Sequence, residues 1–429
     1  MKTLIKNGKV IDTESCSIRE ADILVEEARI ASIRKNIKEE GCEVFDAKGL
    51  IVCPGFIDLH VHLREPGFEA QETIETGTKA ALKGGFTTVV CMPNTNPPVD
   101  NEGIVSLIKL RAEKDGYVEV LPTACITKGR LGEELAEISK LVAAGACAIS
   151  DDGSTVMNSL VMRRALEYIK MFNIPLIDHC EDHHLSDSGL VNEGYCSTSL
   201  GLKGIPSASE EIIVLRDILL CEYVNSRVHI AHVSTKGSVS LIREAKKRGV
   251  RVTAETAPHY FSLTDKSLVG YDTNFKVNPP LRSSEDMIAI QEGLRDGTLD
   301  AIATDHAPHT SDDKDKEFQD APFGMIGLET SFAVGITELY RKDVLSLPEL
   351  VQKYTVGPAC VLGLDKGILK EGHEANITIV DTEKSFMVRE DFFAGKSRNS
   401  PYLGRTLQGT VEAVFVNGNL RYNKGSFRK

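Results

Sequence analysis

Eight short apolar runs recur through the middle of this chain, and most are followed by a stretch with the spacing of an amphipathic helix. This alternation, over roughly three hundred residues, predicts parallel strands covered by helices. Eight such units are the number that closes a (β/α)₈ barrel of the TIM type. A doubly wound sheet is the alternative, but no GxGxxG follows the first run. The predicted strands are 55–60, 87–92, 118–124, 146–150, 175–179, 228–233, 250–255 and 301–305, and predicted helices include 72–83, 159–171, 210–220 and 237–248.

The two ends of the chain differ from its middle and are similar to each other. Both contain short apolar strands and an Asn-Gly pair, Asn7-Gly8 near the start and Asn417-Gly418 near the end. Because Asn-Gly between apolar pieces is a strong hairpin signal, we expect a turn at each pair. The economical arrangement is a composite β-sandwich domain of residues 1–54 and 365–429 beside a catalytic barrel of residues 55–364.

The composition limits the kinds of partner that the protein can have. Its 429 residues are 41% hydrophobic, which is enough for a large core, and its net charge of -12 argues against a nucleic-acid or anionic-membrane partner. No apolar run reaches the ~18 residues of a membrane span, and Lys6 and Lys9 stand where a signal peptide needs an apolar core. The 10 cysteines form no CxxC pair. We therefore expect a cytoplasmic protein that acts on a small molecule.

Imidazole and carboxylate groups stand at the ends of the predicted strands. In a barrel these ends meet on one face, where reactive groups lie. Alternate residues share a face of a strand, so the two imidazoles of His60-Val61-His62 can point at one ion. The full set exceeds what one tetrahedral ion needs and therefore predicts a pair of divalent ions. The set is His60, His62, Asp151 or Asp152, His179, His232 and Asp305.

Some neighbours of this set fall outside the pattern. His229 lies three residues before His232 and so faces the other side of its strand, which predicts a structural role for it. Asp151 and Asp152 also point to opposite sides, and strand alternation alone does not choose between them.

Three segments resemble the motifs of the dihydroorotases. They are PGFIDLHVHLREPG at 54–67, MPNT at 92–95 and ATDHAPH at 303–309. Their order and spacing are similar to those of the longer bacterial class, class I, and the resemblance covers essentially the whole chain. It implies an amidohydrolase barrel with a composite terminal β domain and a binuclear centre of two Zn²⁺ ions per subunit.

The resemblance also implies which residues bind the metal. Many amidohydrolases bridge their ions with a carbamylated lysine, but no lysine stands at 149–153. In this class an aspartate serves instead, and the resemblance places it at Asp152. The other implied ligands are His60, His62 and Asp305 for the first ion and His179 and His232 for the second.

The implied reaction is the reversible interconversion of (S)-dihydroorotate and N-carbamoyl-L-aspartate in de novo pyrimidine (UMP) biosynthesis. The metal ions would make water nucleophilic at neutral pH, and Asp305 would act as general base and then as general acid. Arg64 stands two residues after His62, where its guanidinium suits a substrate carboxylate. The substrate-binding set, most of it implied by the resemblance, is His62, Leu63, Arg64, Asn94, Asn278, His309, Phe323 and Gly324.

Two other functions stay open. An allantoinase or hydantoinase would share the barrel and the metals, but hydantoinase-like chains usually carry the bridging lysine, and allantoinase-like chains tend to have Asn where Arg64 stands. A non-catalytic dihydroorotase-like partner of aspartate transcarbamoylase would have lost metal ligands, whereas every ligand position is filled here. A homo-oligomer and an association with aspartate transcarbamoylase are both compatible with the sequence. The polar stretch 309–324 is predicted to be a lid over the site.

Overall fold

Eight parallel strands form the barrel that the apolar runs predict. The computed structural model describes residues 2–429, and its strands pair in the order β15-β14-β13-β10-β9-β8-β7-β6. The two edges meet at His306, which bridges to Val61 and accepts a hydrogen bond from the amide of His62 at 2.9 Å, so the barrel is nearly closed. The strands are β6 (Phe56–Val61), β7 (Phe86–Cys91), β8 (Glu119–Ala124), β9 (Ala148–Ile149), β10 (Leu176–Asp178), β13 (Val228–Ile230), β14 (Val252–Thr256) and β15 (Ala301–Ile302).

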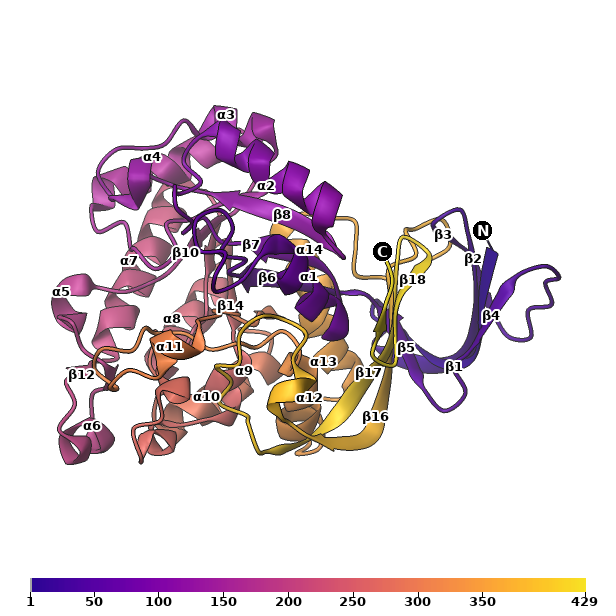
Figure 1. Cartoon of the computed structure of the whole chain (residues 1–429). Helices are drawn as coiled ribbons and strands as arrows, with labels where there is room; N and C mark the ends of the chain where they lie inside the picture. Colours follow the sequence, from indigo (N-terminus) through magenta and orange to yellow (C-terminus); the bar gives the residue numbers. More distant parts are fainter. Residues whose placement is uncertain (1) are drawn as a thin grey trace.

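Helices cover the outside of the barrel (Figure 1). The four helices predicted by range are all present within a few residues of the expected bounds. A local cap explains where a further helix, α10 (Ser284–Arg295), begins, because the Ser283 hydroxyl accepts from the Asp286 amide and the Asp286 carboxylate accepts from the Ser283 amide. The main helices are α1 (Ile74–Lys83), α2 (Glu102–Asp115), α3 (Ile138–Ala144), α4 (Ser159–Ile169), α7 (Ala208–Val224), α8 (Lys236–Lys247), α10 (Ser284–Arg295), α13 (Leu347–Tyr354) and α14 (Val356–Leu362).

Shorter elements occupy the connections between these strands and helices. They place polar loops around the carboxyl ends of the barrel strands, where a site is expected. The short helices and strands are α5 (His183–Ser186), α6 (Tyr195–Leu200), α9 (Pro258–Ser262), α11 (Ser311–Lys314), α12 (Ser331–Gly335), β11 (Val191–Asn192) and β12 (Gly204–Ile205). Single 3-10 turns lie at Lys128–Arg130, Asp265–Leu268, Thr273–Phe275 and Glu390–Phe392, and a π-helical turn lies at Ile336–Tyr340.

Strands from both ends of the chain share a second sheet, beside the barrel in Figure 1. It is continuous, with the order β19-β18-β17-β16-β5-β1-β2-β3 and with β4 paired to β1. Ile5 and Ile23 from the start of the chain share one core cluster with Ile377 and Phe415 from its end. The composite terminal β domain is therefore confirmed, while its boundaries at residues 54 and 365 stay a prediction. Its strands are β1 (Lys2–Asp12), β2 (Ser17–Glu26), β3 (Arg29–Arg34), β4 (Glu43–Asp46), β5 (Ile51–Pro54), β16 (Ile377–Met387), β17 (Thr406–Val416), β18 (Asn419–Asn423) and β19 (Ser426–Phe427).

The two Asn-Gly pairs have different structures. Asn417 and Gly418, with φ of 48° and 75°, form the predicted turn between β17 and β18. The turn predicted at Asn7-Gly8 is wrong, because the pair lies inside β1 at a shift of its register against β2. A Cβ on Gly8 would lie 2.5 Å from Val52 Cγ2. Glycine is thus needed at this bulge because β5 passes close to its backbone.

Residues 388–405 leave the terminal sheet and pack on the barrel. Val388, Phe393 and Tyr402 are buried in the core cluster that contains the barrel strands. Asn399 reaches the loop after β15, where its amide nitrogen donates to the carbonyl of Ala307 at 3.0 Å. The C-terminal part of the chain therefore supports the carboxyl end of the barrel as well as the terminal sheet.

Between residues 2 and 429, no helix combines the length and apolarity that are needed to cross a bilayer. The ten cysteines are all free, and Cys16 and Cys360 are exposed.

Candidate active site

All six predicted metal ligands lie together at the carboxyl ends of the barrel strands. Each is on a strand end or in the loop that follows one, and each is at most 6% exposed. Chain segments more than two hundred residues apart are brought together in this way, since parallel strands end on one face. The group is His60, His62, Asp152, His179, His232 and Asp305, and we call it the ligand cluster.

Asp152 occupies the centre of the ligand cluster. Its Oδ1 lies 3.2 Å from His60 Nε2, 3.8 Å from His232 Nε2 and 4.0 Å from His179 Nδ1. Its Oδ2 lies 3.7 Å from His62 Nε2. One carboxylate thus faces all four imidazoles, which is the position that a bridging ligand between two ions would need.

The structure distinguishes Asp152 from its neighbour Asp151. Asp151 turns away to the loop after β8, where it accepts hydrogen bonds from the amides of Ile126 at 2.9 Å and Thr127 at 3.2 Å, and from the Thr127 hydroxyl. A buried carboxylate with several donors is a loop-fixing group. Asp152 is therefore the aspartate that faces the histidines, at the position the resemblance implies.

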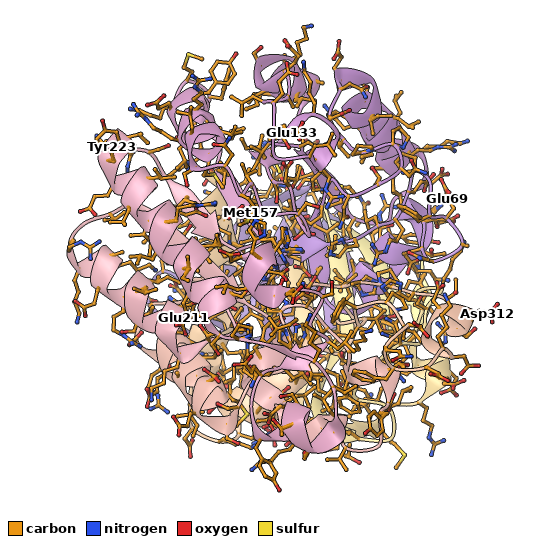
Figure 2. All side chains as sticks on the ribbon, turned by 90° about the vertical axis from the view of Figure 1, so that its left-hand side faces the viewer. Glu69, Glu133, Met157, Glu211, Tyr223 and Asp312 are labelled. Atoms are coloured by element: carbon orange, nitrogen blue, oxygen red, sulfur yellow. The ribbon has the colours of Figure 1, made fainter. Side chains whose placement is uncertain are left out.

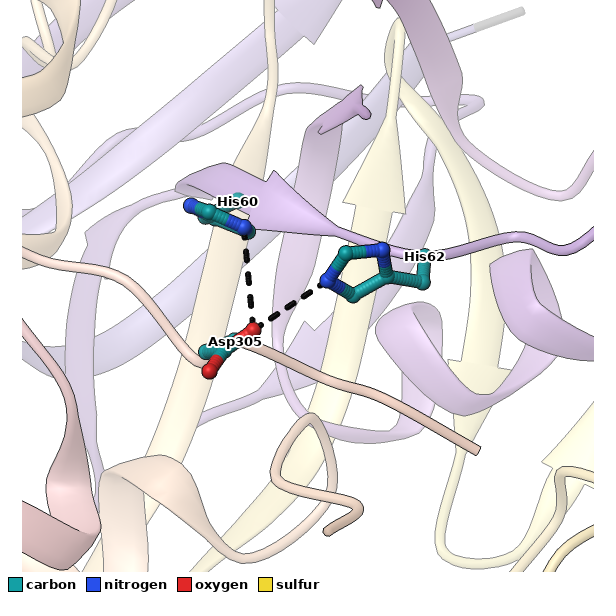
Figure 3. A group of neighbouring side chains, drawn as sticks. All are labelled: His60, His62 and Asp305. Atoms are coloured by element: carbon teal, nitrogen blue, oxygen red, sulfur yellow. Dashed lines mark hydrogen bonds and ion pairs between the residues drawn. The ribbon is translucent and has the colours of Figure 1, made fainter. Parts of the chain in front are cut away.

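Asp305 lies against the two histidines of β6, as Figure 3 shows. Its Oδ1 is 3.2 Å from His62 Nε2 and 3.6 Å from His60 Nε2. Burial alone would raise the pKa of Asp305, but the neighbouring imidazoles of His62 and His60 hold that pKa well below its usual range. Its φ of 49° is unusual for a residue other than glycine. Such strain is common where the surrounding structure fixes a functional side chain.

Asp58 connects the two strand ends that carry these residues. Its Oδ1 accepts from the amides of His60 and Thr304, each at 3.0 Å, and its Oδ2 accepts from the Thr304 hydroxyl at 2.6 Å. Asp58 is fully buried. It therefore fixes the end of β6 against the loop that carries Asp305.

The second half of the cluster is the pair His179 and His232. His179 Nδ1 lies 2.9 Å from His232 Nε2, and both atoms face Asp152. The other ring nitrogen of His179 lies 3.0 Å from Glu181 Oε2. An acidic partner on the far nitrogen is a common arrangement for a metal-binding histidine, because it orients the ring.

The donor set fits a divalent cation. The Asn94 amide nitrogen donates to Asp152 at 3.2 Å, which leaves its oxygen facing His62 Nδ1 at 2.9 Å. His62 therefore carries its proton on Nδ1 and presents the lone pair of Nε2 to the Asp305 carboxylate. Two acceptors 3.2 Å apart repel each other unless a cation lies between them. Buried imidazoles and carboxylates at this spacing suit zinc and similar ions.

Arg64 and His309 lie beside the cluster. Arg64 Nε donates to the carbonyl of Pro308 at 3.2 Å, and Arg64 Nη2 lies 3.4 Å from His309 Nε2. Burial and the neighbouring Arg64 charge lower the pKa of His309 to about 3, so His309 is neutral at physiological pH. A guanidinium next to a neutral imidazole can bind an anionic group without a charge on the imidazole.

The other residues predicted to bind substrate differ in how they lie relative to the cluster. Phe323 offers its carbonyl to His309 Nε2 at 2.8 Å, and Gly324 follows it with a φ of 131°. The Asn278 amide donates to Glu181 at 2.8 Å, and thus lies beside His179. The side chain of Leu63 belongs to the hydrophobic core, so only its backbone could face a substrate.

Three residues next to the cluster were missed by the sequence analysis. Glu255 lies one residue before the end of β14 and 3.4 Å from His60 Nδ1, so the strand-end rule could have found it. Glu181 follows His179 by two residues and gave no signal beyond that spacing. Asn399 could not be found, because it comes from a segment assigned to the terminal domain.

The segment 309–324 reaches the surface at Asp312, which lies on the same edge of the view in Figure 2 as Glu69. Two buried lysines bond to carbonyls of this segment. Lys276 Nζ donates to Phe318 and Ala321, and Lys314 Nζ donates to Pro322 at 2.9 Å and Gly324 at 3.0 Å. The structure therefore holds the predicted lid by specific contacts; its mobility stays a prediction.

Comparisons with known proteins identify the family of the chain. A family model described as "Dihydro-orotase-like" matches residues 49–238, and one described as "Amidohydrolase family" matches residues 222–422. A protein named Dihydroorotase from Pelotomaculum thermopropionicum is 56% identical over 97% of this chain and 98% of its own length. One of the same name from Acetivibrio thermocellus is 53% identical over 97% and 98%.

Solved structures support the same fold. L-Hydantoinase (Dihydropyrimidinase) from Arthrobacter aurescens superimposes with a TM-score of 0.90 at 27% identity, covering 100% of this chain and 97% of that protein. The (β/α)₈ barrel is thus confirmed, and the resemblance to the dihydroorotases is confirmed over nearly the full length. The chain belongs to the dihydroorotase family of the amidohydrolases.

Proposed function

We propose that the protein is a dihydroorotase, which opens and closes the ring that relates dihydroorotate to N-carbamoyl-L-aspartate. The observation that carries the proposal is the position of Arg64 and His309 beside a buried ligand cluster, in a chain 56% identical to a named dihydroorotase. The substrate has a carboxylate next to a cyclic amide, and the site offers a cation next to a place for metal ions. It is thus a hydrolase that acts on a cyclic amide.

We infer that two Zn²⁺ ions per subunit occupy the cluster. His60, His62 and Asp305 would hold one ion, His179 and His232 the other, and Asp152 would bridge them. When bound, such ions lower the pKa of a water molecule and polarise a carbonyl group. A metal-dependent reaction follows from the family and from the donor set, while the identity and number of the ions are the proposal.

Residues of the chain would then bind the substrate and transfer the proton. Arg64 and His309 would hold the carboxylate, and Asn278 with the backbone at 323–324 would hold the ring. Asp305 is ionised at neutral pH because its pKa lies well below its usual range, so it can accept a proton from the attacking water. The Asp305 carboxylate would then return that proton to the leaving ring nitrogen. The Asn94 side chain forms hydrogen bonds with His62 and Asp152. It would therefore hold these two side chains in place as well as bind the substrate carboxylate.

The experiment is a side-by-side assay of the purified protein with dihydroorotate, hydantoin and allantoin. We expect turnover of dihydroorotate in both directions, loss of turnover after treatment with a chelator, and recovery on addition of zinc. Faster turnover of hydantoin or allantoin would favour the alternative cyclic amidohydrolases. No turnover of any of the three by zinc-loaded protein would favour the non-catalytic alternative.

The partners and the cellular location remain predictions. A homo-oligomer is tested by light scattering, and an association with aspartate transcarbamoylase by co-elution of the two purified proteins. The cytoplasmic location is tested by fractionation of cells that express the chain.

A further inference from the structure

Glu255 lies between two buried histidines at the bottom of the ligand cluster. Its Oε1 is 3.4 Å from His60 Nδ1, and its Oε2 is 3.2 Å from His229 Nε2. All three side chains are at most 1% exposed. In the described part of the chain, neither oxygen of Glu255 has a partner in hydrogen-bonding geometry, so the two imidazoles are its charge partners. A buried carboxylate in this position must be matched by donors, or its burial would be strongly unfavourable.

The contacts determine where each imidazole carries its proton. An ionised carboxylate only accepts hydrogen bonds, so His60 Nδ1 and His229 Nε2 must both be N–H groups. The second nitrogen of His229 then accepts from the Thr253 hydroxyl, 2.8 Å away. The result is a chain of four groups, Thr253, His229, Glu255 and His60, in which each N–H or O–H group faces an acceptor.

The far end of this chain is the nitrogen of His60 that faces the cluster. With its proton on Nδ1, His60 presents the lone pair of Nε2 toward Asp152 at 3.2 Å and Asp305 at 3.6 Å. Figure 3 shows that one ring nitrogen of His60 faces Asp305 and the other points away from it. The opposite tautomer would place a hydrogen where a cation has to be, and would exclude His60 as a ligand.

We propose that Glu255, supported by His229, is a positioning residue that fixes the ring and the tautomer of His60 for metal binding. This rests on the proposed function only in assigning a metal to the cluster. It also gives His229 a role, since His229 holds the second oxygen of Glu255 and is itself held by Thr253. His229 thus acts on the cluster through Glu255, two contacts away from the ligand nitrogen of His60.

The test is the affinity of the metal-free protein for zinc, measured by competition with a chromogenic chelator. Glu255→Gln keeps the shape of the side chain but places an amide N–H against one imidazole N–H. The ring of His60 or of His229 must then change its tautomer or turn. We expect zinc to bind Glu255→Gln about 10- to 100-fold less tightly than it binds the wild-type protein. We expect Glu255→Asp to bind zinc more tightly than Glu255→Gln, because it retains the charge.

Controls separate this role from a general effect on folding. Glu329 is also buried, but its carboxylate accepts from the amides of Ala394 and Gly395. Glu329→Gln should leave zinc affinity unchanged, whatever it does to the unfolding temperature. His229→Asn should weaken zinc binding less than Glu255→Gln does, and it serves as the second variant if Glu255→Gln fails to fold.

Zinc affinity within twofold of wild type in folded Glu255→Gln or His229→Asn would overturn the proposal, as would an equal loss in Glu329→Gln. The readout is independent of the substrate. Wild-type protein that binds zinc tightly but does not convert dihydroorotate would therefore refute the proposed function and leave this inference standing.

Discussion

Gly324 lies where the predicted lid contacts the proposed substrate-binding residue His309. Its replacement by alanine would place a methyl group directly into that contact. A Cβ at this position would lie 2.9 Å from His309 Nε2 and 2.8 Å from the Cβ of Ala307. Something must move, and the imidazole is the more mobile neighbour. We expect Gly324→Ala to displace His309 from the position in which it would hold the substrate carboxylate.

The size of the effect follows from the contacts. The φ of 131° at Gly324 places alanine in a region that L side chains rarely adopt, which costs roughly 1–3 kcal/mol. If His309 moves, the substrate loses a hydrogen bond to its charged carboxylate, which is worth roughly 1.5–3 kcal/mol. We therefore expect kcat/KM to fall by about 10- to 150-fold, mainly through KM.

A matched variant isolates the contact from the backbone strain. Gly270 has a φ of 106°, but no heavy atom lies within 4 Å of the position that an alanine methyl group would take there. Gly270→Ala should share the loss of stability and keep normal kinetics. The assay is kcat and KM for dihydroorotate in both variants, together with their unfolding temperatures. Equal kinetics in the two variants would refute the assignment of His309 and Gly324 to the substrate site.

Variants at three other residues test the proton transfer, the support of the site and the lid segment. Asp305→Ala should retain part of its zinc, measured by atomic absorption, but lose about 10²- to 10⁴-fold in turnover because the proton acceptor is missing; full turnover would remove Asp305 from that role. Asn399→Ala removes the partners of the His309 amide and of the Ala307 and Gly324 carbonyls. We expect a lower unfolding temperature and a higher KM, whereas an unchanged KM would separate this segment from the site. Burial lowers the pKa of Lys314 to about 7, so between pH 7 and about 10 the unfolded chain holds a proton that the folded protein has released. The free energy of unfolding of wild type should therefore rise relative to Lys314→Met across this window, by at most about 1.4 kcal/mol per pH unit; parallel pH curves in denaturant titrations would contradict this.

The barrel was predictable because its strands are buried on both faces. Continuous apolar runs such as 87–92 and 228–233 stand out against the helical spacing between them. The cluster was predictable for a related reason: polar groups such as His60 and Asp305 interrupt these runs at their ends. Alternation could not separate Asp151 from Asp152, since the structure decides this by the direction of one loop.

Other features depend on contacts that no local pattern encodes. Asn7-Gly8 has the composition of a hairpin, but the close approach of Val52 makes it a bulge inside a strand. Asn399 supports the site from a segment nearly one hundred residues after His309, and the path of that segment across the barrel is set by tertiary packing. Glu255 lies at a predicted strand end, but its role appears only when His60 and His229 are seen on either side of it.

The ligand cluster is proposed to hold the metal ions of the reaction. The most direct measurement is anomalous X-ray scattering at the zinc edge from crystals of the active, zinc-loaded protein. We predict two peaks on either side of the Asp152 carboxylate, one against His60 and His62 and one against His179 and His232. Fully active protein with no peak among these residues, or with its zinc bound elsewhere, would contradict the claim.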